Sequence, residues 1–207
     1  ELIKRLENFN YDNLYISSIY PFGITEDRYR KNTLGNYGCL FTAFVNIGNS
    51  YNKAKVEGSD TNNGGIAGYT DGYIYNCYNQ GDVYCTNTGT NVVGGISGRI
   101  GYVDYVYNLG NVYGNGTHVG GIYGSFAVAS LENAYNMGTA STTKEGESIR
   151  KHANQVDTTV ENLSVVVNGS TYTTLVDALN AWVNANKSTY PELKNWVMVD
   201  GYPGFAN

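Results

Sequence analysis

The chain has 207 residues, of which 42% are hydrophobic and only 15% are charged, so it can bury one large core or two small ones. Its net charge of -5 argues against nucleic-acid binding, which draws on clustered Lys and Arg, and no apolar run is long enough to insert into a membrane. The 26 glycines and 20 tyrosines favour short strands and tight turns over a helical bundle.

The N-terminal segment, residues 1–37, opens with ELIKRLENF, a short predicted helix, and continues as an irregular aromatic stretch. We interpret this segment as an N-terminal cap, because the open end of a repeat stack needs protection against edge-to-edge association. The alternative is a degenerate coil of the same array.

One phrase recurs from residue 64 onward. Gly-Gly-Ile begins at Gly64, Gly94 and Gly120, and each copy closes on Tyr-Asn, with a glycine two residues further on. A degenerate earlier copy within 38–58 keeps Tyr-Asn at 51–52 but lacks the double glycine. Self-similarity at this spacing indicates a repeat architecture.

Each copy contains an alternating stretch before its closing Asn, which predicts a strand; Ile74, Asn76 and Tyr78, for example, would share one face of it. The Asn-x-Gly that follows predicts a turn, since both residue types tolerate positive φ. A second short strand is predicted near Val83 and its equivalents. A further strand begins in each copy at Ile66, Ile96 and Ile122.

A single copy cannot bury its own apolar face, whereas copies stacked about 4.8 Å apart place Ile on Ile and Tyr on Tyr. We therefore predict a mainly β fold: a short parallel β-solenoid over residues 38–141, with a right-handed β-helix favoured. A solenoid built from β-hairpins is the competing geometry, because spacing alone does not fix the number of strands in a coil.

The repeated pattern, Gly-Gly-aliphatic-x-Gly and then aliphatic-x-Asn-x-Tyr-Asn-x-Gly-x-Val, resembles the GLUG motif. The resemblance covers Gly64 to Ala140 clearly and 38–58 weakly. GLUG repeats occur in secreted and surface proteins of bacteria, including IgA-specific metallopeptidases and surface proteins of gut bacteria. The resemblance implies an extracellular or cell-surface location and a role as a repeat segment, and it implies no catalytic residue.

After residue 141 the composition becomes polar, and we predict a linker over 142–157. Residues 158–207 predict a C-terminal α+β cap made of a hairpin, a helix and a strand. The hairpin turns at Asn168–Gly169, and the helix begins after Thr174, which can cap it. We expect the helix to cover the last coil.

Catalytic and metal-binding patterns are missing from the sequence. HExxH and GxSxG do not occur, and the two histidines, His118 and His152, lie far from the cysteines in sequence. Cys39, Cys77 and Cys85 form no CxxC pair, so we interpret them as free thiols, with a Cys77–Cys85 disulfide as the alternative. No metal site and no cofactor are predicted.

The acidic residues of the repeats lie at different positions in their respective copies, so we expect stacking not to align them. Within 64–141 these acids are Asp71, Asp82, Asp104 and Glu132. A glycoside-cleaving site needs two carboxyl groups facing one another, which this arrangement does not predict.

Tyrosine is the remaining signal. Tyr73 aligns with Tyr102, and Tyr84 with Tyr113, at positions predicted to point outward. Aromatic rings there are candidates for binding a glycan or a host surface protein, although tyrosine also suits strands and half-exposed surfaces by itself. We expect a non-catalytic extracellular module of a bacterial surface protein, a stalk or an adhesin. The alternative is a carbohydrate-active enzyme, a glycoside hydrolase or lyase on a β-helix.

Overall fold

The computed structural model describes residues 9–10, 47–59, 61–86, 91–115, 118–142, 155–157 and 161–206. Of the predicted N-terminal cap only β1 (Phe9–Asn10) lies within this part of the chain. Cys39 and His152 lie outside the described residues, as does most of the predicted linker.

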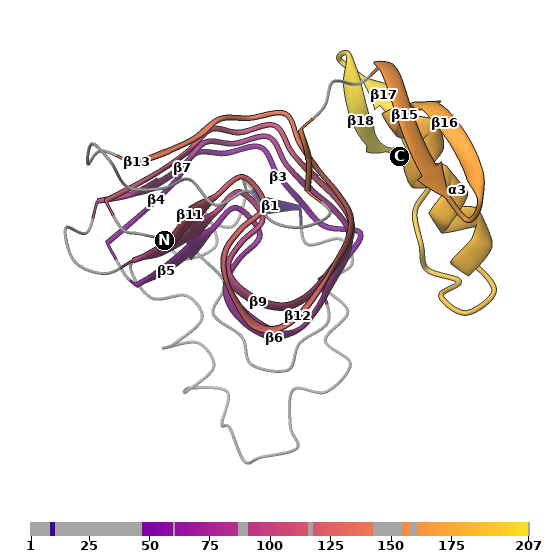
Figure 1. Cartoon of the computed structure of the whole chain (residues 1–207). Coiled ribbons are helices and arrows are strands. Elements are labelled where there is room, and N and C mark those ends of the chain that lie inside the picture. The colour runs from indigo at the N-terminus through magenta and orange to yellow at the C-terminus, as the bar shows by residue number, and fades with distance from the viewer. Residues whose placement is uncertain are drawn as a thin grey trace.

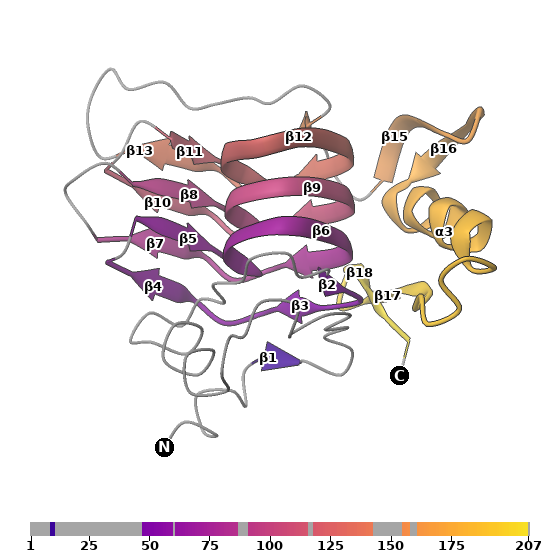
Figure 2. The same ribbon diagram turned by 90° about the horizontal axis from the view of Figure 1, so that it is seen from below.

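Successive copies of the repeat stack in parallel and form three sheets (Figures 1 and 2). One buried cluster lies within the bend of the long sheet, and a second lies between the other two sheets. The long sheet contains β2 (Ile47–Gly48), β3 (Tyr51–Asn52), β6 (Ala67–Asn79), β9 (Ser97–Asn108), β12 (Tyr123–Asn136) and β14 (Gln155–Asp157), with β1 antiparallel at its edge. The valine sheet contains β4 (Val56–Gly58), β7 (Val83–Cys85), β10 (Val112–Gly114) and β13 (Ala140–Thr142). The Gly-Gly sheet contains β5 (Asn62–Gly64), β8 (Val92–Gly94) and β11 (His118–Gly120).

This arrangement confirms the predicted parallel β-solenoid, because the strands of neighbouring copies pair in parallel in all three sheets. A full coil contributes one strand to each sheet, so the solenoid is not built from hairpins. The right-handed sense of winding stays a prediction.

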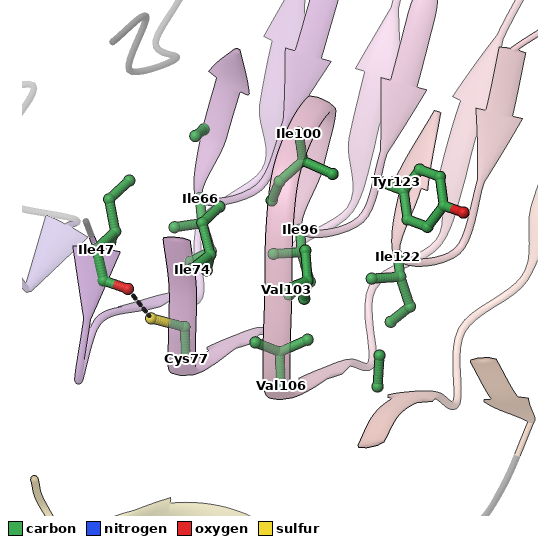
Figure 3. Packing of buried hydrophobic residues seen from close by; sticks show 12 residues of the cluster. Ile47, Ile66, Ile74, Cys77, Ile96, Ile100, Val103, Val106, Ile122 and Tyr123 are labelled. Atoms are coloured by element: carbon green, nitrogen blue, oxygen red, sulfur yellow. Dashed lines mark hydrogen bonds between the residues drawn. The ribbon is translucent and has the colours of Figure 1, made fainter. Parts of the chain in front are cut away.

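The register places like residues on one another. Tyr78 pairs with Tyr107, which pairs in turn with Tyr135. The isoleucines that follow the double glycines line the core, as Figure 3 shows for Ile66, Ile96 and Ile122. Burying each of these side chains stabilises the fold by roughly 1.5–3 kcal/mol relative to leaving it exposed.

The turn predicted at Asn-x-Gly was wrong in its backbone geometry. In the described coils, positive φ occurs three residues earlier than the closing Asn, at one corner of the long strand in each copy: Asn49, Asn76, Tyr105 and Asn133, with φ of 52°, 50°, 52° and 45°. We call these four residues the corner column. The glycine after each Asn is needed for close approach instead, since a Cβ on Gly81 would lie 1.9 Å from the Ala54 carbonyl oxygen of the preceding coil.

Residues 161–206 form the C-terminal module. It consists of the hairpin β15 (Glu161–Val167) and β16 (Ser170–Thr174), the helix α3 (Leu175–Asn186), and a second hairpin, β17 (Trp196–Val199) and β18 (Tyr202–Phe205). The predicted hairpin and helix are confirmed, and the Thr174 hydroxyl accepts the expected bond from the Asp177 amide at 3.2 Å. The predicted final strand is the first strand of that second hairpin.

The module lies along the side of the solenoid, not over its last coil as we expected (Figure 2). The apolar stripe of α3, with Leu175, Leu179 and Val183, joins one buried cluster with the stacked tyrosines of several coils. That tyrosine row offers apolar surface from four coils, whereas the end of the stack offers only one. The last long strand pairs instead with β14, which comes from the end of the predicted linker.

Candidate functional site

The four candidate tyrosines form two separate stacks. The rings of Tyr73 and Tyr102 lie 4.4 Å apart on the long sheet, and those of Tyr84 and Tyr113 lie 4.6 Å apart on the valine sheet. Tyr73 is 44% exposed and the other three are half-buried, so all four reach the surface at the predicted positions. Because the two stacks belong to different sheets, they form two surfaces and not one platform.

The Tyr84 stack has charged neighbours. The Lys55 ammonium lies 4.3 Å from the centre of the Tyr84 ring, and the Tyr84 hydroxyl donates to the Asp82 carboxylate at 3.4 Å. Burial of the hydroxyl, followed by the nearby Asp82 charge, raises the pKa of Tyr84. Lys55 also forms an ion pair with Glu57 at 2.6 Å. One ammonium and two carboxylates therefore lie near the Tyr84 ring, one carboxylate paired with the ammonium and the other with the Tyr84 hydroxyl.

A polar row runs beside these rings on the valine sheet and consists of Asp82, Asn111 and Thr139. The Asn111 backbone amide donates to the Asp82 carboxylate at 2.8 Å, and the Thr139 hydroxyl donates to the Asn111 side-chain oxygen at 2.7 Å. Asp82 and Asn111 lie two residues before Tyr84 and Tyr113, directly ahead of β7 and β10, and Thr139 has the same place ahead of β13. The bond from the Tyr84 hydroxyl to Asp82 shows that the aromatic rings and these hydrogen-bonding groups lie next to one another.

Two acids that we expected to be misaligned share a register. Asp104 of β9 pairs with Glu132 of β12. The copies differ in length at the bend of the long strand, where the register shifts between Thr70 and Tyr73 and again between Phe126 and Ser130. Counting from the double glycine therefore misaligns these acids, whereas counting back from Tyr-Asn aligns them.

The described cysteines, Cys77 and Cys85, are buried and do not form a disulfide with one another, so the alternative of a Cys77–Cys85 disulfide is wrong. Burial raises the pKa of Cys77 to about 12, and its sulfur accepts a hydrogen bond from the Ser50 amide at 3.4 Å. Such a thiol is a poor nucleophile at neutral pH, because the thiolate is the reactive form. His118 is half-buried at the start of β11. Among the described residues, no three His, Cys, Asp or Glu gather at one potential metal site.

The contact between the solenoid and the C-terminal module was missed by sequence reasoning. The Asn49 side chain donates to the Glu192 carbonyl at 3.1 Å and accepts from the Lys194 amide at 2.8 Å. The Asn76 side chain donates to the Lys194 carbonyl at 3.0 Å. Two corner residues therefore hold the main chain of the segment that leads into β17.

Trp196 is the centre of this contact and is 2% exposed. Its indole nitrogen donates to the Asn76 side-chain oxygen at 2.5 Å, and Asn180 of α3 binds both its amide and its carbonyl at 2.9 Å. The indole packs 5.6 Å from the Tyr78 ring and 5.8 Å from the Tyr107 ring. The only signal in the sequence was the recurring Asn before Tyr-Asn, which we interpreted as part of an alternating strand.

Beneath the module the closing tyrosines form a buried stack. The rings of Tyr51 and Tyr78 lie 4.9 Å apart and those of Tyr78 and Tyr107 lie 5.1 Å apart, nearly parallel in both cases. Burial raises the pKa of Tyr78, Tyr107 and Tyr135, and the Tyr107 hydroxyl donates to the Pro203 carbonyl. We call these four closing tyrosines, which pair in register from coil to coil, the inner tyrosine stack: Tyr51, Tyr78, Tyr107 and Tyr135.

The one described helix, α3, is too short to cross a membrane, and no other described segment is a long apolar helix. Comparison of the chain with models of known protein families, with curated proteins and with solved structures gives no match.

Proposed function

We propose that the chain is a non-catalytic, extracellular repeat module of a bacterial surface protein, and that the outer face of its valine sheet is an adhesive surface for a glycan. The observation that carries this proposal is the Tyr84–Tyr113 stack beside the polar row of Asp82, Asn111 and Thr139. The extracellular location and the bacterial source rest on the resemblance of the repeats to the GLUG motif.

A sugar has apolar C–H faces and a rim of hydroxyl groups, so its binding sites combine aromatic rings with a few hydrogen-bonding side chains. The valine sheet offers both within neighbouring rows of one surface. In register with Tyr113, the next strand carries Ser141 and not a third aromatic residue.

The charge of this surface favours a neutral glycan. Among the described residues at the stack, Lys55 is a cation and Glu57 and Asp82 are acids. Their excess of one negative charge repels an anionic sugar such as a uronate. A neutral sugar can donate its hydroxyl protons to the carboxylate and to the Asn111 side chain.

The role as a scaffold is supported by the contacts that the repeated residues make between coils. The side chains of Asn52, Asn79, Asn108 and Asn136 form a hydrogen-bonded ladder through the coils, with amide-to-oxygen distances of 2.8 to 3.0 Å. The glycines and the inner tyrosine stack are likewise used in contacts between coils. The residues that define the repeat thus hold the solenoid together, and the outward positions are left for recognition.

A glycan array probed with the full chain tests the proposal. We expect binding of neutral glycans that is lost in the Tyr84→Ala/Tyr113→Ala variant. The matched control is Tyr73→Ala/Tyr102→Ala, which removes an equal stack from the long sheet and should retain binding. Absence of any glycan signal, or equal loss in both variants, would contradict the assignment to the valine sheet.

A carbohydrate-active enzyme is the second candidate, and the shared register of Asp104 and Glu132 is the observation that favours it. Retaining and inverting glycosidases both use a pair of carboxyl groups. Release of reducing sugar from a polysaccharide panel that is abolished by Asp104→Asn would support this candidate over the adhesive module.

A further inference from the structure

The surface that receives the C-terminal module repeats itself from coil to coil. The module contacts the inner tyrosine stack and the corner column, and both have equivalents one coil further along, because Tyr51 pairs with Tyr78 and Tyr78 with Tyr107. Phe205, for example, lies 6.3 Å from the Tyr51 ring and 5.4 Å from the Tyr78 ring. A shift of the module by one coil, about 4.8 Å, would bring it onto nearly the same side chains.

One residue breaks this repetition. The corner column carries Asn in three of the four coils and Tyr105 in the third. A bulky aromatic residue is disfavoured at positive φ, whereas Asn tolerates it. Asn would relieve the backbone strain at Tyr105, and Asn is present at the other three corners. Because the strained residue is nevertheless a tyrosine, we infer a role for its side chain.

The Tyr105 side chain is used by the module. It is 5% exposed and stacks on Trp182 of α3 at 4.6 Å with an angle of 22° between the rings. Trp182 also lies 6.2 Å from Tyr75 in the coil below. The helix therefore stacks on the one aromatic residue among the four described corners.

We propose that Tyr105 is the residue that sets the register of the C-terminal module on the solenoid, acting both for the correct position and against the shifted one. In the observed register Tyr105 stacks on Trp182 while Asn76 holds Lys194 and Trp196. After a shift of one coil toward the C-terminal end, Tyr105 would occupy the place of Asn76. Asn76 binds the Lys194 carbonyl and the Trp196 indole N–H with two separate atoms close to the backbone, whereas the single hydroxyl of a tyrosine lies at the far end of a ring; it cannot take both positions, so the shifted register loses these bonds.

Distance measurement between two spin labels tests this proposal. The labels are attached to cysteines introduced at the exposed Thr139 of the solenoid and Ser188 of the module, in the full chain carrying Cys39→Ser. With Tyr105 in place we expect a single distance. Tyr105→Asn places the residue of the other three corners at this position and should keep the coil folded, but should add a second population displaced by up to about 5 Å, one coil.

Tyr105→Phe is the matched control, because it keeps the ring and the stacking on Trp182; it should retain the single distance. A merely structural role predicts the opposite result for Tyr105→Asn: an unchanged single distance, with equal or greater stability because the strain at positive φ is relieved. An unchanged single distance in Tyr105→Asn, with a circular dichroism spectrum like that of the unmodified chain, would overturn the proposal. A second distance in Tyr105→Phe would overturn it as well.

Discussion

The side-chain amide of Asn108 lies directly against the backbone of Gly95, so that a Cβ added to Gly95 would lie 2.3 Å from the Asn108 Cγ. The same relationship joins Gly65 to Asn79 and Gly121 to Asn136, with 2.4 Å to Cγ in each case. The opening and the closing of each repeated phrase therefore meet inside the coil. The double glycine and the final Asn recur together because the second glycine, which has no Cβ, leaves the space that the Asn side chain occupies.

Gly95→Ala should destabilise the protein strongly. The new methyl group would meet Asn108 and also the Gly121 carbonyl oxygen of the next coil at 2.2 Å, and a backbone atom cannot move aside as a side-chain end can. We expect a loss of about 3 kcal/mol or more in the free energy of unfolding, at or above the upper end of ordinary overpacking. Urea denaturation measures it.

The matched control for that substitution is Gly204→Ala, where the nearest atoms belong to the Val199 side chain at 3.1 and 3.3 Å. This change should cost less than about 1 kcal/mol. Equal denaturation midpoints for the two variants would show that the coils are not packed as closely at Gly95 as described.

Asn79→Ala should cost about 2–4 kcal/mol, because it breaks the hydrogen-bonded ladder at an interior rung. Its side chain accepts from Asn52 and donates both to Asn108 and to the Gly81 carbonyl, at 2.7 to 2.8 Å. Asn136→Ala, at the end of the ladder, breaks only one bond to a neighbouring rung and should cost about half as much. A larger loss at the end than in the interior, measured by calorimetry, would contradict a continuous ladder.

Much of the scaffold could be predicted from the sequence. Repetition of Gly-Gly-Ile and Tyr-Asn indicated stacked parallel coils, and period-two alternation indicated that Tyr73 and Tyr84 point outward. These features depend on neighbours in sequence and on identical neighbours in the next coil, so a repeat reveals them. The alignment of Asp104 with Glu132 could not be predicted, because the copies differ in length at the bend and the two acids lie at different distances from the double glycine.

The docking of the C-terminal module could not be predicted in the same way. It joins Asn49 to Lys194 and Asn76 to Trp196, residues more than a hundred positions apart that have no repeated partner. The corner geometry was also hidden, since positive φ at Asn76 is a property of the backbone that an alternating strand pattern does not reveal. Long-range contacts made once in the chain leave no periodic signal.

The stability of the protein should fall steeply above pH 10. Burial holds the pKa of Tyr78, Tyr107 and Tyr135 in the folded state above the value near 10 of an unfolded chain. The stability that these neutral phenols contribute is therefore fully present below pH 10 and is lost as the pH rises, since the unfolded state releases their protons first. Each tyrosine lowers the folding equilibrium constant by up to about tenfold per pH unit in this range.

Urea denaturation between pH 8 and 11.5 measures this dependence. Tyr78→Phe removes one titrating hydroxyl while keeping the stacked ring, so its stability should fall less steeply with pH than that of the unmodified chain. A flat profile up to pH 11.5, or identical slopes for the two proteins, would mean that the inner tyrosine stack is open to solvent.

The in-register stacking of the coils is tested most directly by nuclear Overhauser contacts between the methyl groups of Ile66, Ile96 and Ile122 in a selectively labelled chain. These buried side chains follow the double glycines of three successive coils, and the Ile66 amide donates to the Ile96 carbonyl as the Ile96 amide does to that of Ile122. We predict cross-peaks between Ile66 and Ile96 and between Ile96 and Ile122, and none between Ile66 and Ile122, which lie two coils or about 10 Å apart. Absence of both neighbouring cross-peaks would contradict the stacked solenoid and the surfaces described on it.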